Sequence, residues 1–142
     1  MKRVNIHETQ PAAYQAMFGL EQYLETIDLP PRLIELVRTR ASQINGCAFC
    51  IQMHSKAAQK QGESAERLLA LAAWQHSPLF SEAERAAFAL TEEMTRLPAG
   101  GVSDAVYGAL APHFSDTQTA QLIMLVTTIN AWNRIAVSTR VQ

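Results

Sequence analysis

Apolar residues recur along most of this chain at intervals of three and four, the spacing of helices that bury one face. The alternation of apolar and polar residues that marks half-buried strands is almost absent. The first such run predicts a helix from about Pro11 to Thr26, with five apolar positions: Tyr14, Met17, Phe18, Leu20 and Leu24. The pattern therefore predicts an all-α protein.

Proline and glycine divide the next stretch into separate helices. The Asp28-Leu29-Pro30-Pro31 segment ends the first helix, and a proline suits the first turn of a second helix from about Pro31 to Gln43. Asn45-Gly46 interrupts the chain, because both residue types tolerate left-handed backbone angles. A third helix is predicted from Cys47 to about Gln61, and it stops at Gly62.

A fourth helix is predicted from Ala65 to about Gln75, with Ser64 as its N-terminal cap. Its apolar residues are expected to point inward: Leu68, Leu69, Leu71 and Trp74.

Two capping boxes mark the remaining long helices. Residues 81–84 and 115–118 both place a serine three positions before a glutamate or glutamine, so that side chains and backbone amides satisfy each other. The helices they begin run to about Arg96 and Ser138, with a short helix from about 104 to 110 between them. We expect one domain over residues 1–142, a bundle of six or seven helices whose core spans about 11–138.

Composition limits the classes of partner. The chain has 142 residues, 48% hydrophobic and 18% charged, which is ordinary for a folded domain without a metal or disulfide staple. Its 12 basic and 13 acidic residues are scattered, so no surface for nucleic acid or anionic lipid is expected. The N-terminus lacks the apolar core of a signal peptide, and the longest apolar-rich run, Leu122 to Trp132, is about half a membrane span. We expect a cytoplasmic protein with no membrane partner.

The candidate chemistry lies in one short run, because Cys47 and Cys50 are the only cysteines of the chain. Two residues three apart on a helix have α-carbons about 5 Å apart, which suits a disulfide. Such a bond closes a very small loop and adds little stability, so the pair is typical of a redox site. The first turn of a helix also favours thiolate over thiol.

Two further residues could complete this site. His54 lies one turn after Cys50, where its imidazole could accept the thiol proton. Cys50 is therefore the better candidate nucleophile, and Cys47, at the helix edge, is expected to be the more accessible partner. Glu35 stands among apolar positions of the preceding helix, and a buried carboxylate needs a partner such as His54. These residues predict a proton relay from Glu35 through His54 to Cys50.

Other readings of these residues stay open. The cysteines could be two small packing residues, and Glu35 could face solvent. A zinc site would need more ligands, and only three further histidines are present, with no second paired motif: His7, His76 and His113. His76 is interpreted as a helix-end residue. Asn130, Asn133 and Arg134 are expected to form buried hydrogen bonds or subunit contacts. No flavin, nucleotide or metal motif is visible, so no cofactor is expected.

The pattern Glu35-x11-Cys47-x2-Cys50-x3-His54, with Asn45-Gly46 before it and Gly62 after it, resembles the carboxymuconolactone decarboxylase superfamily. More specifically, it resembles the alkyl hydroperoxidase D-like branch. Two further segments, 74–85 and 129–134, share this resemblance, which covers about Pro31 to Ile135.

The resemblance implies an all-helical fold, a homo-oligomer (trimer or hexamer) and thiol-dependent peroxidase activity of an antioxidant kind. By position, Cys50 corresponds to the cysteine that attacks the peroxide, Cys47 to its disulfide partner, and His54 and Glu35 to the proton relay. A hydroperoxide would be the substrate and an external thiol or dithiol the reductant.

Two departures bear on this expectation. Superfamily members that act as decarboxylases lack the cysteine pair, which argues against that reaction here. The founding alkyl hydroperoxidase D proteins carry a histidine at the position of Phe49, so one acid–base group is missing. A decarboxylase-type enzyme and a non-enzymatic redox-sensing module remain the alternatives.

Overall fold

The computed structural model describes all 142 residues, and it consists of helices and loops without a strand. The all-α prediction is confirmed. Seven of the eight α-helices correspond to predicted ones, and the eighth is the four-residue α1, which Asn5 caps. The α-helices are α1 (Ile6–Thr9), α2 (Pro11–Leu24), α3 (Pro31–Asn45), α4 (Ala48–Lys60), α5 (Ala65–Ala70), α6 (Glu82–Arg96), α7 (Asp104–Gly108) and α8 (Asp116–Thr139), with a 3₁₀ helix η1 (Leu71–His76).

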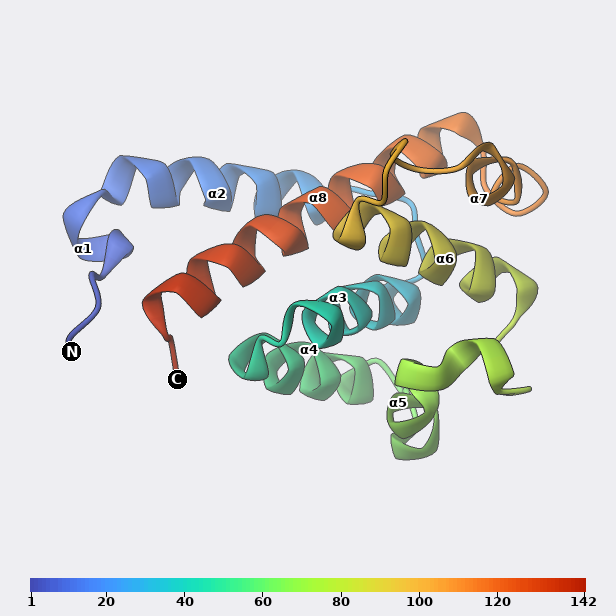
Figure 1. The fold of residues 1–142 in the computed structure, drawn as a ribbon, viewed down its shortest axis with the longest axis horizontal. Helices are drawn as coiled ribbons and strands as arrows, with labels where there is room; N and C mark the ends of the chain where they lie inside the picture. The colour runs from blue at the N-terminus through green and yellow to red at the C-terminus, as the bar shows by residue number, and fades with distance from the viewer.

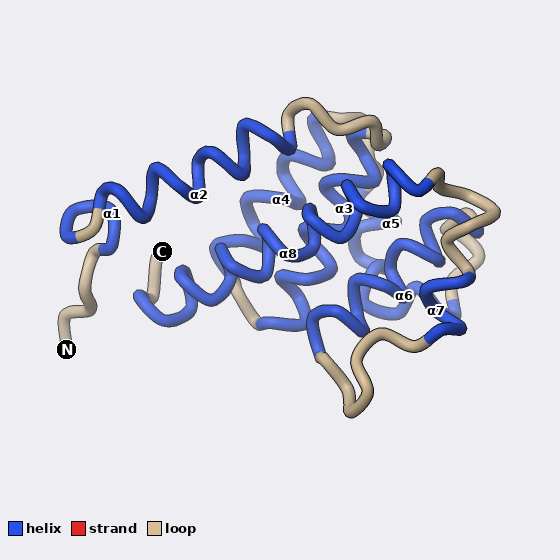
Figure 2. The backbone as a smooth tube through the Cα atoms, turned by 90° about the horizontal axis from the view of Figure 1, so that it is seen from above, coloured by secondary structure: helices blue, strands red, loops and turns tan.

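The helices are arranged around α3, which packs against α4, α6 and α8 (Figure 1). Helix α2 lies beside α8, and α3 and α4 form an antiparallel pair. Both chain termini lie at the same end of the molecule, as Figures 1 and 2 show from two directions. The corner between α3 and α4 points toward that end (Figure 1). No helix has both the length and the apolar character that a membrane crossing requires.

The apolar faces that periodicity predicted form the core. Helix α3 contributes Leu36 and Val37, both without exposed surface, and α6 contributes Phe88. Helix α8 adds three side chains that are fully buried: Leu122, Leu125 and Val126. Burial of a leucine or phenylalanine side chain stabilises the fold by about 1.5–3 kcal/mol, so these few residues fix the packing of α3.

The fourth predicted helix is wrong in one respect. It ends as an α-helix at Ala70 and continues as the 3₁₀ helix η1, with a non-helical backbone at Ala73. Leu68 packs against the core from α5, and the residue after it lies about 100° further round the helix and faces away from the core. Leu71 and Trp74 are buried as predicted, but Leu69 is 85% exposed.

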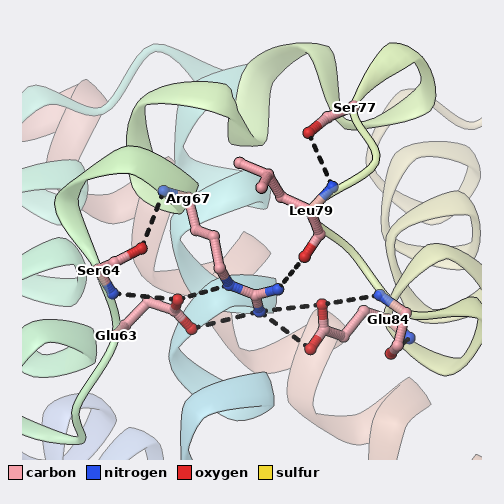
Figure 3. A network of polar contacts seen from close by, with 7 residues as sticks. Glu63, Ser64, Arg67, Ser77, Leu79 and Glu84 are labelled. Carbon is pink, nitrogen blue, oxygen red and sulfur yellow. Dashed lines mark hydrogen bonds and ion pairs between the residues drawn. The ribbon is translucent and has the colours of Figure 1, made fainter.

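A charged network fixes the position of α5 against α6 (Figure 3). Arg67 forms ion pairs with Glu63 and with Glu84, whose oxygen lies 2.9 Å from the Arg67 guanidinium. Arg67 also donates a hydrogen bond to the Leu79 carbonyl and stacks over the Phe80 ring at 4.8 Å. The network gives the charged residues of this stretch a structural role.

Candidate active site

The corner between α3 and α4 brings the two cysteines together. Gly46 ends α3 with a φ of 68°, a left-handed angle that glycine adopts without strain. Cys47 is the N-cap of α4, and its sulfur accepts a hydrogen bond from the Cys50 amide at 3.3 Å. A disulfide joins Cys47 and Cys50, whose α-carbons are 5.3 Å apart, as the helical spacing predicted.

The expectation that Cys47 is the more accessible cysteine is wrong. Cys47 and Cys50 are only 3% and 5% exposed, and it is Cys50 that lines a pocket. Cys47 sits at the tight corner, where its amide donates to the Ser42 carbonyl at 3.0 Å. Cys47 lies in this turn, just outside α4, whereas Cys50 lies within the first turn of α4.

Glu35 and His54 meet across α3 and α4. The Oε2 atom of Glu35 lies 2.9 Å from Nδ1 of His54, and the two side chains are 13% and 14% exposed. Burial raises the pKa of Glu35, but the His54 hydrogen bond and the Arg38 charge outweigh burial and hold that pKa below its ordinary value. Glu35 is therefore a carboxylate, which can only accept hydrogen bonds. The Nδ1 atom of His54 must donate, so in a neutral ring Nε2 is free to act as a base.

The hydrogen-bond network around Glu35 extends further than the cysteine–histidine motif indicated. Arg38 donates to Oε1 of Glu35 and to Oε2 of Glu21, each at 2.9 Å. The other Glu21 oxygen accepts from the Trp132 indole at 2.9 Å. The i, i+3 spacing of Glu35 and Arg38 on one helix is a signal that could have identified Arg38. No local pattern links Glu21 on α2 or Trp132 on α8 to the cysteine pair.

A cluster of amides anchors the end of α3 to α8. Asn133 is fully buried and donates to the Ser42 hydroxyl at 3.0 Å. Asn45 donates to the side-chain oxygens of Asn133 (2.9 Å) and Asn130 (3.0 Å), and Arg134 donates to the same Asn130 oxygen at 2.8 Å. The prediction of buried hydrogen bonds is confirmed for Asn133, whereas Asn130 is half-buried and the hydrogen bonds of Arg134 are exposed. Because the cluster holds the last turn of α3, it also fixes the turn that carries Cys47.

A pocket of about 390 Å³ opens beside the disulfide. Cys50 and His54 line it from α4, and aromatic side chains line it from α2 and α8: Tyr14, Phe18 and Trp132. Nine of its 11 lining residues are hydrophobic. The pocket thus places one sulfur of the dithiol and one histidine against an apolar surface. No three His, Cys, Asp or Glu side chains gather here or elsewhere in a way that could hold a metal ion.

Glu35 should contribute to stability in a pH-dependent way. Its folded-state pKa lies below the ordinary carboxyl value, so its contribution is complete above that value and is lost as pH falls through the folded-state pKa. We expect Glu35→Gln to lower the free energy of unfolding by about 1.5–3 kcal/mol near neutral pH, the range for hydrogen bonds to charged groups. The difference should shrink below about pH 4.5, the ordinary value for this carboxyl.

Urea unfolding of the oxidised protein across the acid range measures this difference. The exposed Glu25, which forms no side-chain hydrogen bond, provides a matched Glu25→Gln control with little effect at any pH. A Glu35→Gln deficit that stays constant with pH would contradict the assignment.

Comparisons with known proteins find similar sequences. The model of the carboxymuconolactone decarboxylase family matches residues 11–93. The uncharacterized protein YdfG of Bacillus subtilis is 36% identical over 96% of this chain and 93% of its own length. The uncharacterized protein YnjA of Escherichia coli is also 36% identical, over 69% of this chain and 53% of its own length.

Solved structures share the fold. A protein of unknown function from Agrobacterium tumefaciens, suggested to be the antioxidant defence protein AhpD, is 37% identical with a TM-score of 0.95. The match covers 100% of this chain and 97% of that one. The debrominase Bmp8 has a TM-score of 0.82 at 21% identity, covering 95% of this chain and 73% of its own, which shows a common fold alone.

Proposed function

Because this chain belongs to the carboxymuconolactone decarboxylase family, in its alkyl hydroperoxidase D-like branch, we propose that it is a thiol-dependent peroxidase. It reduces hydroperoxides through a dithiol–disulfide cycle of Cys47 and Cys50. One observation carries the proposal: Cys50, already joined to Cys47, shares an apolar pocket with a histidine whose Nδ1 is held by a carboxylate. The antioxidant role suggested for the Agrobacterium relative supports it.

The cycle begins with the reduced dithiol. The Nε2 atom of His54 takes the proton of the Cys50 thiol, and the thiolate attacks the terminal oxygen of the hydroperoxide. The O–O bond breaks, the sulfur keeps one oxygen as a sulfenic acid, and the leaving alkoxide receives the proton from His54 to depart as an alcohol. With hydrogen peroxide the leaving group is water. Glu35 keeps His54 in the required tautomer and stabilises the imidazolium that forms.

Cys47 completes the cycle. Its thiol attacks the Cys50 sulfenic acid, water leaves, and the disulfide forms. With α-carbons 5.3 Å apart, the two sulfurs can bond without unwinding α4. An external thiol or dithiol then returns two electrons and two protons to the pair by thiol–disulfide exchange.

The test is peroxide consumption by the purified protein with an excess of a small dithiol. With the dithiol in excess, we expect continuous loss of hydroperoxide. Reduced protein that is treated with one equivalent of hydroperoxide and no reductant should lose the mass of two hydrogens. Protein whose thiols have been alkylated beforehand is the control, and it should consume none.

Two other outcomes would overturn the proposal. A wild-type protein that consumes no hydroperoxide but decarboxylates a lactone acid, equally well as a Cys47→Ser/Cys50→Ser variant, would be a decarboxylase-type enzyme. A protein that shows neither reaction but changes its assembly size between oxidised and reduced forms would be a redox-sensing module.

A further inference from the structure

We propose that the pocket beside Cys50 selects neutral hydroperoxides whose body carries an aromatic ring, and that Tyr14, Phe18 and Trp132 are the specificity-determining residues. The inference rests on the proposed peroxidase function, since it names the substrate class of the same site. The inference gives α2 a role in substrate recognition. This helix supplies two of the three rings, whereas both cysteines and His54 belong to α4 and its N-cap.

The three rings form one aromatic surface. The Tyr14 ring lies 5.4 Å from Trp132 and 5.5 Å from Phe18, both nearly edge-to-face, and the Phe18 and Trp132 rings are 5.9 Å apart. Aromatic rings prefer such tilted contacts at 4.5–7 Å, and a pair contributes about 0.5–1.5 kcal/mol beyond its buried area. A substrate ring can therefore extend this cluster, whereas an aliphatic body gains only the burial of its surface.

The polar groups of the pocket favour a neutral substrate. Glu21 and His54 are its two charged or polar lining residues apart from Cys50, and all the others are hydrophobic. Both carboxylate oxygens of Glu21 are already bound, one by Arg38 and one by Trp132. The pocket thus offers no free cation to an anionic substrate, and an added carboxylate would lie near that of Glu21 without a partner.

The size of the pocket argues against hydrogen peroxide as the preferred substrate. About 390 Å³ falls within the range of small-molecule sites. A molecule of water takes up about 30 Å³ in the liquid, and hydrogen peroxide is only slightly larger, so it would leave most of this apolar surface unused. A ring-bearing hydroperoxide can instead place its reactive oxygens at Cys50 and its ring against the aromatic surface.

The relay and the aromatic surface share one support. Glu21 of α2 accepts one hydrogen bond from Arg38, which also binds Glu35, and another from the indole of Trp132, which lines the pocket. Helix α2 is therefore bonded both to the proposed relay and to the aromatic surface. Phe18 itself is 40% exposed, which means that its truncation removes part of the pocket wall without opening a cavity in the core.

The experiment compares second-order rate constants for oxidation of the reduced dithiol by cumene, tert-butyl and hydrogen peroxides. We expect cumene hydroperoxide to react fastest. Phe18→Ala should lower the ratio of the cumene to the tert-butyl rate constant by about threefold to tenfold, the range that one aromatic contact corresponds to. Tyr23→Ala is the matched control, because Tyr23 lies on the same helix and is also 40% exposed but does not line the pocket. Its ratio should equal that of wild type.

A binding measurement separates this inference from the proposed function. The product alcohol of cumene hydroperoxide should quench or shift tryptophan fluorescence of the oxidised protein, and Phe18→Ala should weaken its binding. Binding without any peroxide turnover would remove the peroxidase proposal and support the aromatic pocket. Equal rate ratios in wild type and Phe18→Ala would overturn the inference while peroxidase activity stands. Alcohol binding that disappears as the protein self-associates would show that a second copy of the chain fills the pocket, which also overturns it.

Discussion

We expect Cys50→Ser to reduce peroxide consumption to the rate of the uncatalysed reaction between peroxide and reductant. A serine hydroxyl is neither acidic enough to ionise beside His54 nor oxidisable to a sulfenic acid, so the first step is lost. The remaining cysteine, Cys47, does not line the pocket and has no disulfide partner in the chain. The measurement is peroxide loss in the presence of an excess of a small dithiol.

Cys47→Ser is the control for this result, because it keeps the proposed nucleophile and removes only its disulfide partner. Attack by Cys50 should persist for a single turnover, and without its partner the sulfenic acid should accumulate. The intact mass should then rise by one oxygen, and a dimedone-type reagent should trap the product. Turnover with a small thiol should be slower, because that thiol has to attack the Cys50 sulfenic acid directly.

The two variants also decide between competing physical effects. The N-cap position of Cys47 and its hydrogen bond from the Cys50 amide favour a thiolate at Cys47. The pocket and His54 favour Cys50 instead. Cys50 is therefore the proposed nucleophile, because the nucleophile has to meet a substrate and only Cys50 of the two lines the pocket. Single-turnover oxidation that survives in Cys50→Ser and fails in Cys47→Ser would reverse the two roles.

Features that depend on neighbouring residues could be predicted from the sequence. The capping boxes that Ser81 and Ser115 begin are both present, because their hydrogen bonds join residues three apart. The disulfide could be expected for the same reason, since helical geometry alone sets the separation of Cys47 and Cys50.

Features that depend on packing between distant segments could not be predicted. The buried pair of Arg40 and Glu92 (2.8 Å) joins residues 52 positions apart, and Glu92 also accepts from the Trp74 indole. Their local surroundings in the sequence resemble those of solvent-facing helix residues. The hydrogen bonds of Glu21 with Arg38 and Trp132 are of the same kind. The contact between Glu35 and His54 could be predicted only in part. The apolar surroundings of Glu35 in the sequence indicated that its carboxylate needs a partner, but they did not identify that partner as His54.

His54→Gln should slow oxidation of the dithiol by about 10²–10⁴-fold near neutral pH, the usual contribution of a general acid–base group. A glutamine amide can still donate a hydrogen bond to Glu35, so the carboxylate keeps a partner and α3 and α4 stay packed. The amide cannot accept the Cys50 proton, and it cannot return a proton to the leaving oxygen. The loss should therefore fall on the chemical step rather than on folding.

The pH dependence of that loss distinguishes catalysis from structure. A free thiol ionises without help near about pH 8.5, so the rate of His54→Gln should recover toward that of wild type as pH rises through this region. Stopped-flow oxidation of the reduced proteins between neutral and alkaline pH measures the two profiles. His76→Gln is the matched control, because His76 lies exposed at the end of η1 and does not line the pocket. An unchanged rate in His54→Gln would remove the base assignment, and an equal loss at every pH would assign His54 a structural role instead.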